Sequence, residues 1–195
     1  MGATGEKEKA EPQEGRATQP FWREKLIILV CFAILVSDQV SKRMIVSHFE
    51  IPKNPEERVV VIKGFFDLVY RTNPGAAFSL FQGKKNLLAL ISILAVGALI
   101  WFRHHFDNGT RASKMALGLM LGGILGNLID RIIYETGVVD FVRIYIEHRS
   151  GGVSEWPAFN IADSAICVGV AILIMLAWSE QKENGAEEET EPKES

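Results

Sequence analysis

The chain has 195 residues, of which 48% are hydrophobic, and a formal net charge of −3. The negative charge comes largely from a Glu-rich C-terminal end, and no compact basic stripe is present, which argues against a nucleic-acid-binding protein. Both cysteines fall inside apolar runs, where a thiol behaves as a small hydrophobe, and the cysteine and histidine spacing indicates neither a disulfide framework nor a metal site.

Four apolar stretches are long enough to cross a bilayer, which needs about 20 helical residues. Ser37 and Asp38 interrupt the first stretch, while the second and fourth end near Trp101 and Trp178, the kind of residue that anchors a helix at the membrane interface. The sequence therefore predicts an all-α membrane protein with four transmembrane helices, at 26–46, 86–102, 115–133 and 161–178.

The first apolar stretch has a competing interpretation as a cleavable signal peptide. No small-x-small cleavage pattern follows it, and Asp38 and Lys42 stand where cleavage would have to occur, so a retained helix is favoured. The polar residues 1–24 and 179–195 lack apolar periodicity, and we expect both ends to be disordered. Residues 25–178 are then the single folded domain.

The orientation follows from the short connection between the second and third stretches. It carries Arg103, Arg111 and Lys114, and basic residues in short loops favour the cytoplasmic side. Four spans place both termini on one side, so we expect cytoplasmic N and C termini.

The segments on the opposite side read as more than linkers. Residues 58–62 and 65–70 are rich in β-branched and aromatic residues, with Lys63-Gly64 between them and Asn73-Pro74-Gly75 after them. This pattern predicts a small extracytoplasmic β-sheet. Residues 138–146 alternate apolar and polar residues and fit either an interfacial helix or a short strand, of which we expect the helix.

Carboxylates occur where a membrane protein least tolerates them. Asp38, Asp130 and Asp163 lie within or at the ends of the apolar stretches, and Asp140 directly precedes the last one. An Asp at the centre of a spanning helix costs about 2.5 to 3.5 kcal/mol, so such residues usually face a polar interior and carry a function. Two carboxylates held close together share a proton, which supplies an acid and a base for water-mediated hydrolysis.

Each of these residues also has a simpler interpretation. Asp163 suits the first turn of any helix, with Asn160 as a possible N-cap. Asp38 and Lys42 fit an ordinary i, i+4 pair on a helix surface, and Asp130 with Arg131 fits an interfacial ion pair. On geometry alone, the helix-terminus interpretation of Asp163 is as good as a catalytic one.

Five short motifs decide between these interpretations, and each stands at a set place relative to an apolar stretch. The motifs are D-Q-V-S-K at 38–42, N-P-G-A-A-F at 73–78, G-N-L-I-D-R at 126–131, V-V-D-F at 138–141 and F-N-I-A-D-S at 159–164. Together they resemble the lipoprotein signal peptidase family, also called signal peptidase II, whose members are aspartyl proteases of the bacterial inner membrane. The resemblance covers about residues 26 to 178.

The resemblance implies a catalytic pair, Asp140 and Asp163, and no metal or other cofactor. It implies diacylglyceryl-modified prolipoproteins as substrates, cut just before the lipidated cysteine, with membrane lipid as the other partner and the active site on the periplasmic side. Further positions of the family that shape or support the site map onto Asp38, Lys42, Asn73, Gly75, Asn127, Asp130, Arg131 and Asn160.

One stretch departs from the family pattern, and two other classes of protein stay open. The Gly-rich segment 149–155 is longer than is typical of the family. A small proton-coupled transporter also needs intramembrane carboxylates but usually shows internal repeats, which are not evident here; a membrane scaffold leaves the carboxylates unexplained. Gly118, Gly122 and Gly126 form a small-residue face that favours helix packing within a monomer over dimerisation.

Overall fold

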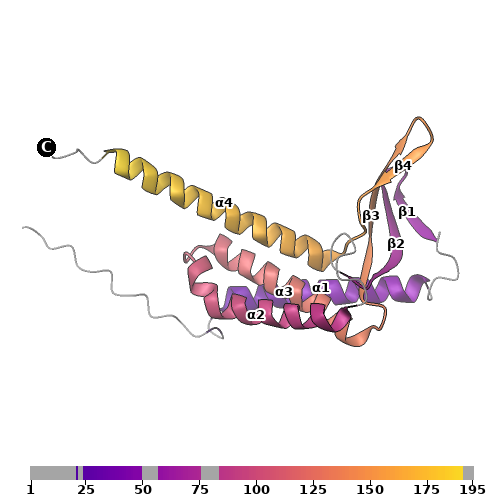
Figure 1. Cartoon of the computed structure of the whole chain (residues 1–195), viewed down its shortest axis with the longest axis horizontal. Coiled ribbons are helices and arrows are strands. Elements are labelled where there is room, and N and C mark those ends of the chain that lie inside the picture. Colours follow the sequence, from indigo (N-terminus) through magenta and orange to yellow (C-terminus); the bar gives the residue numbers. More distant parts are fainter. Residues whose placement is uncertain (1–20, 22–23, 50–56, 76–83, 191–195) are drawn as a thin grey trace, which may run out of the picture.

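The computed structural model describes residues 21, 24–49, 57–75 and 84–190, the last eight of them by backbone alone. The described part contains four helices and four strands (Figure 1). In chain order they are α1 (Lys25–Phe49), β1 (Arg58–Ile62), β2 (Phe66–Asn73), α2 (Lys85–Phe106), α3 (Arg111–Ile133), β3 (Val138–His148), β4 (Gly152–Glu155) and α4 (Ile161–Thr190).

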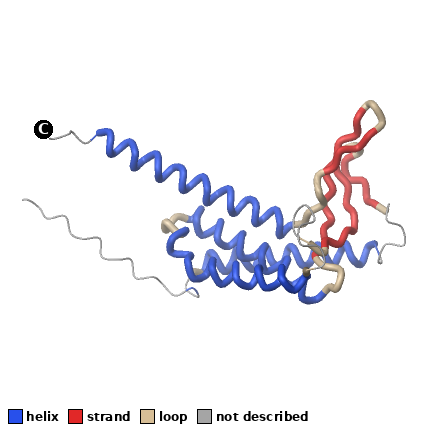
Figure 2. The backbone as a smooth tube through the Cα atoms, in the orientation of Figure 1, coloured by secondary structure: helices blue, strands red, loops and turns tan. Residues whose placement is uncertain are grey.

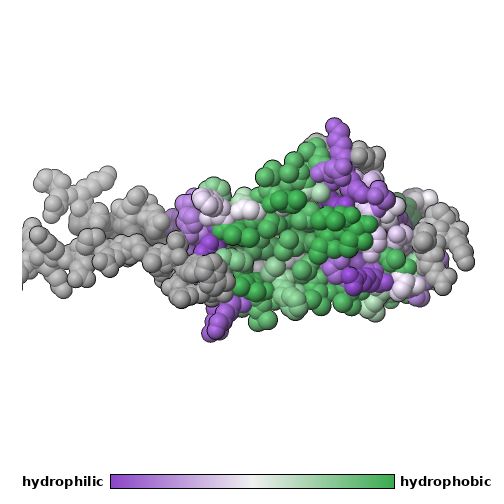
Figure 3. Space-filling view, turned by 90° about the horizontal axis from the view of Figure 1, so that it is seen from below, coloured by the Kyte–Doolittle hydropathy of each residue, from purple (hydrophilic) through white to green (hydrophobic). Residues whose placement is uncertain are grey.

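Within the described residues, three helices are long and apolar enough to cross a membrane. They comprise Lys85–Phe106, Arg111–Ile133 and Ile161–Lys182. α1 is not among them, because Asp38, Lys42 and Arg43 lie in its second half. The molecule is thus a helical membrane protein, and its helices present a broad apolar band between polar ends (Figure 3).

α3 is the central helix, packed against α1 on one side, α4 on another and, less extensively, α2. Glycines on α3 allow the two closest approaches. A Cβ at Gly118 or Gly122 would lie 2.7 Å from the nearest atom of α1, and one at Gly123 or Gly126 would meet Ala162 or Asp38. This small-residue face therefore packs against other helices of the same chain.

The strands form one antiparallel sheet in the order β1-β2-β3-β4, at one end of the helices (Figure 2). The two strands predicted at 58–62 and 65–70 are present as a pair, the second running from Phe66 to Asn73. The interfacial helix expected at 138–146 was wrong. These residues form β3, because their period-two alternation finds a backbone partner on each side, β2 along its first part and β4 along its last.

The Gly-rich segment 149–155 supplies the turn and the fourth strand of the sheet. Gly151 takes φ +84° in that turn, a conformation that costs glycine little. The resulting β3–β4 hairpin projects away from the helices (Figure 1). Glu155 at its base accepts hydrogen bonds from Arg71 of β2 at 2.8 Å and Arg143 of β3 at 2.7 Å, which ties the hairpin to the sheet.

An apolar cluster fixes the sheet to the helices. Ile45 and Phe49 at the end of α1 pack with Val139 and Phe141 at the start of β3, and all four are buried. Burying four such side chains stabilises the junction by several kcal/mol, at about 1.5 to 3 kcal/mol for a large apolar side chain. The start of β3 is thereby held beside the ends of α1 and α3.

The chain ends differ from expectation where the structure describes them. α4 continues as a helix to Thr190, so the disorder expected from residue 179 onward does not hold for 179–190. The rest of that segment, and nearly all of the segment 1–24, lie outside the described residues.

Replacing Gly123 by alanine should destabilise the fold, because the new methyl group would collide with the Ala162 carbonyl and Ile166 of α4. Overpacking of this kind typically costs about 1 to 3 kcal/mol. Gly97 of α2 is the matched control, since a Cβ there meets nothing within 4 Å. Thermal unfolding in detergent should show a lower Tm for Gly123→Ala and an equal or higher Tm for Gly97→Ala; equal Tm values for both variants would contradict this packing.

Candidate active site

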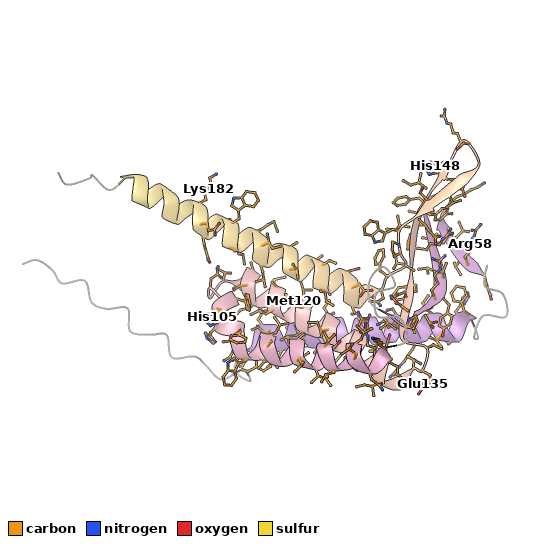
Figure 4. All side chains as sticks on the ribbon, in the orientation of Figure 1. Arg58, His105, Met120, Glu135, His148 and Lys182 are labelled. Carbon is orange, nitrogen blue, oxygen red and sulfur yellow. The ribbon has the colours of Figure 1, made fainter. Side chains whose placement is uncertain are left out.

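The polar side chains singled out in the sequence converge at the end of the helices that carries the sheet. Asp38 of α1 and Asp130 of α3 are fully buried, Asp140 of β3 is 4% exposed, and Asp163 of α4 is half-buried. Figure 4 marks the two ends of the molecule. The labelled Arg58, Glu135 and His148 lie at the end that carries the sheet, and His105 and Lys182 lie at the opposite end.

Asp163 is held by the start of α4 in a reciprocal capping arrangement. The backbone N–H of Asp163 donates to Asn160 Oδ1 at 2.9 Å, and the backbone N–H of Asn160 donates to Asp163 Oδ2 at 3.2 Å. Such a box satisfies two N–H groups at a helix start and places the carboxylate at the positive end of the helix dipole. The helix-terminus interpretation of Asp163 is therefore correct, and it also fixes where the carboxylate points.

Asp140 accepts hydrogen bonds from two amide side chains. Asn160 Nδ2 donates to Asp140 Oδ1 at 2.8 Å, and Asn73 Nδ2 donates to Asp140 Oδ2 at 3.2 Å. Burial, followed by the nearby negative charge of Asp163, raises the pKa of Asp140 from its ordinary 3.8 to about 7. Asp140 is thus a carboxyl group able to keep its proton near neutral pH.

Two asparagines join the two aspartates. Asn160 contacts both of them, and its Nδ2 also donates to Asn127 Oδ1 at 3.1 Å. Asn127 Nδ2 in turn donates to Asp163 Oδ1 at 2.7 Å. Asp140 and Asp163 therefore share one hydrogen-bonded framework although they come from a strand and a helix 23 positions apart in the chain.

Lys42 is the buried cation beneath this framework. Its Nζ lies 2.8 Å from Asp38, 2.9 Å from Asp130 and 2.9 Å from Asn127 Oδ1, and the side chain is 1% exposed. The interpretation of Asp38 and Lys42 as a helix-surface pair was wrong, since both side chains are buried. The interfacial ion pair between Asp130 and Arg131 is likewise replaced by Asp130 with Lys42.

Asp38 and Asp130 also bind backbone groups. Ala162 N–H at the start of α4 donates to Asp38 Oδ1, and Val139 N–H of β3 donates to Asp130 Oδ2, each at 3.0 Å. The two carboxylates consequently attach α4 and β3, the elements that carry Asp163 and Asp140, to α1 and α3.

The remaining predicted residues lie at the edge of the same site. Arg131 Nη1 donates to Asn127 O at 3.2 Å, and its guanidinium lies within electrostatic range of Asp163, Asp130 and Asp140. The backbone N–H of Gly75 donates to Asn73 Oδ1 at 3.0 Å, which leaves Nδ2 of that amide to face Asp140. The structure thus brings together all ten residues predicted from the sequence.

Gln39 belongs to the site although sequence reasoning did not select it. Its Nε2 donates to Asp130 Oδ1 at 2.9 Å and to Gly126 O at 3.1 Å. Its position next to Asp38, as one of few polar residues in an apolar helix, was the available signal. Among the described residues, no group of three or more His, Cys, Asp or Glu side chains could hold a metal ion.

Fold and site together define a helical membrane protein with a carboxylate-rich centre near one end of its helices. The sequence profile of the family described as Signal peptidase (SPase) II matches residues 30–179. The chain belongs to this family and is a peptidase. The resemblance seen in the sequence motifs is confirmed.

Relatives and solved structures agree with that membership. The lipoprotein signal peptidase of Anoxybacillus flavithermus is 36% identical over 163 residues, which cover 83% of this chain and 91% of the relative. That of Moorella thermoacetica is 38% identical over 146 residues, covering 75% and 88% of the two chains. A solved structure of a bacterial membrane enzyme is similar at a TM-score of 0.68 and 29% identity, over 88% of this chain and 94% of that one.

Asp140→Asn should stabilise the folded protein at pH 8 more than at pH 5. Because the folded-state pKa, about 7, exceeds the ordinary 3.8, the stability that the proton provides is fully present below 3.8 and is lost as pH rises to about 7. The wild type therefore carries a buried charge at pH 8, which the amide avoids. Tm measured at both pH values tests this, with exposed Glu147→Gln as the control; the same Tm difference at both pH values would contradict it.

Proposed function

We propose that this chain removes the signal peptide from prolipoproteins whose cysteine carries diacylglycerol, cutting just before that cysteine with Asp140 and Asp163 as the catalytic pair. The observation that carries the proposal is the shared framework in which Asn160 contacts both aspartates. Membership of the signal peptidase II family and relatives named lipoprotein signal peptidases support the substrate class.

The chemistry follows from two carboxyl groups that share one proton. One takes a proton from water as the water oxygen bonds to the scissile carbonyl carbon, and the protonated partner gives its proton to the carbonyl oxygen. The tetrahedral intermediate then collapses: the C–N bond breaks, the amine nitrogen receives the water-derived proton, and the other proton returns to the second carboxylate. No covalent bond to the enzyme forms, and the pair ends as it began.

The supporting residues orient the two aspartates through hydrogen bonds. Asn73, turned by its contact with Gly75, orients Asp140, while Asn127 and Asn160 orient Asp163. Asp38, Lys42 and Asp130 form a buried cluster of charges that attaches both catalytic elements to the helices. Arg131 adds positive charge near a site that carries four carboxyl groups.

We also infer that α1 is a fourth span and that the site faces the periplasm. α1 has 25 residues, about 37 Å at 1.5 Å per residue, and lies along α3. Lys114 Nζ, in the first turn of α3, lies 2.6 Å from Glu24, and Asn108 Nδ2, between α2 and α3, donates to Glu180 of α4 at 2.8 Å. The start of α1 and the far part of α4 therefore lie at the end of the bundle where α2 joins α3. The basic residues Arg103, Arg111 and Lys114 at that end favour the cytoplasm, which leaves the aspartates at the opposite end.

Purified protein should cleave a diacylglyceryl-modified prolipoprotein in detergent, and Asp140→Asn and Asp163→Asn should each lower kcat by about 10²- to 10⁴-fold, the usual contribution of general acid–base catalysis. Glu147→Gln, an exposed change on the same strand as Asp140, is the matched control and should cleave at the wild-type rate. Each variant is first shown to unfold cooperatively. Near-full activity in either aspartate variant would remove that residue from the catalytic pair.

The orientation predicts opposite labelling of the two ends of the helices in intact cells. With both native cysteines replaced by Ser, a single cysteine at exposed Arg149 of the β3–β4 hairpin should react with a membrane-impermeant maleimide applied outside the inner membrane. A cysteine at exposed Asn108 should react only after the membrane is opened. The reverse pattern would invert the orientation.

A further inference from the structure

The buried ammonium of Lys42 fixes the direction of the asparagine amide above it. A lysine ammonium has only donors, so the atom of Asn127 that lies 2.9 Å away must be the carbonyl oxygen, Oδ1. The amide nitrogen of Asn127 then faces the other way, toward Asp163 Oδ1 at 2.7 Å. The cation thereby polarises a donor aimed at one member of the aspartate pair.

The same oxygen orients the second asparagine. Asn127 Oδ1 also accepts from Asn160 Nδ2 at 3.1 Å, so Asn160 presents its nitrogen toward Asp140 and its oxygen toward the backbone N–H of Asp163. Both amide orientations therefore follow from the position of one charge, Lys42 Nζ.

The two aspartates differ in the donors that they receive. Asp163 accepts from the polarised Asn127 amide and from the backbone at the start of α4, where the helix dipole favours a negative charge. Among the described residues, the donors to Asp140 are two neutral side-chain amides, and Asp140 is almost fully buried. Among the described residues, the charged groups near the pair are Asp38 and Lys42 from α1, and Asp130 and Arg131 from α3, which are balanced among themselves. Arg71 of β2, which stands opposite Asp140 in the sheet, is paired with Glu155.

We propose that Lys42 is a positioning residue that determines which aspartate acts as the base and which as the acid. Acting through Asn127, it keeps Asp163 as the carboxylate that accepts the proton of water, and Asp140 is then the acid. This inference rests on the proposed function. A role for Lys42 only as counter-ion to Asp38 and Asp130 accounts for its burial, but it does not explain the short contact with Asn127.

The test compares Lys42→Met/Asp38→Asn with wild type, because the paired change removes one charge of each sign and so keeps the net charge of the cluster formed by Asp38, Lys42 and Asp130. Asp38→Asn alone is the control for the lost carboxylate. Relative to wild type, the double variant should lose at least about tenfold in kcat beyond any loss in Asp38→Asn, with KM changed by less than about threefold. The acidic limb of its profile of kcat/KM against pH should move to higher pH, because the aspartate pair, which titrates as a unit, loses a donor aimed at its ionised carboxylate. Lys114→Met, which removes a lysine–carboxylate pair at the other end of the helices, is the control for a lost ion pair.

An acidic limb that stays in place while overall activity falls would overturn the proposal and leave Lys42 a structural counter-ion. If the double variant does not unfold cooperatively, Asn127→Leu with Lys42 retained is the second test. This change deletes the side-chain donor to Asp163 and should also move the acidic limb to higher pH. An acidic limb that stays in place in Asn127→Leu would overturn the proposal. Failure of the proposed function would look different, since wild type would then not cleave the lipid-modified substrate or an aspartate variant would stay active.

Discussion

Placing charges inside an apolar helical bundle is the constraint on which the rest of the structure depends. An unpaired charge there costs several kcal/mol, so Lys42 must be surrounded by oxygen atoms, and Asp38, Asp130 and Asn127 supply them. Asp38 uses its other oxygen to accept the Ala162 N–H of α4, and the Asp130 oxygen that faces Lys42 also accepts the Val139 N–H of β3. Among the described side chains, none has a buried polar atom without a partner. The requirement to satisfy the buried charges therefore fixes the positions of the two elements that carry Asp140 and Asp163.

The sheet completes the site from outside the helices. The apolar cluster of Ile45, Phe49, Val139 and Phe141 sets the start of β3 on the end of α1, and the turn after β2 brings Asn73 to Asp140. Asp140 therefore comes from a strand and Asp163 from the first turn of a helix, and hydrogen bonds to Asp130 and Asp38 attach both elements to the helical bundle. A water-activating pair needs this attachment, because a small displacement of either carboxyl group would separate acid from base.

Sequence reasoning located the apolar helices, the first two strands and the ten residues that the structure brings together, since each depends on a local pattern or on a motif. It failed where the outcome depends on partners distant in sequence. β3 was expected to be a helix because its alternation alone does not reveal that β2 and β4 pair with it on both sides. The i, i+4 spacing of Asp38 and Lys42 describes their own helix but not the burial that α3 imposes. Gln39 was overlooked because its partners, Asp130 and Gly126, are about 90 positions away.

The most direct test of this account is the pH dependence of kcat/KM for wild-type cleavage of a diacylglyceryl-modified prolipoprotein. The proposed mechanism requires one aspartate ionised and Asp140 protonated, and burial raises the pKa of Asp140 to about 7. Activity should therefore rise from acidic pH, pass through a maximum and fall as the pH increases beyond about 7. Activity that continues to increase from pH 7 to about 9 would contradict the account, because it would require a base that deprotonates in that range instead of a pair of carboxyl groups sharing a proton.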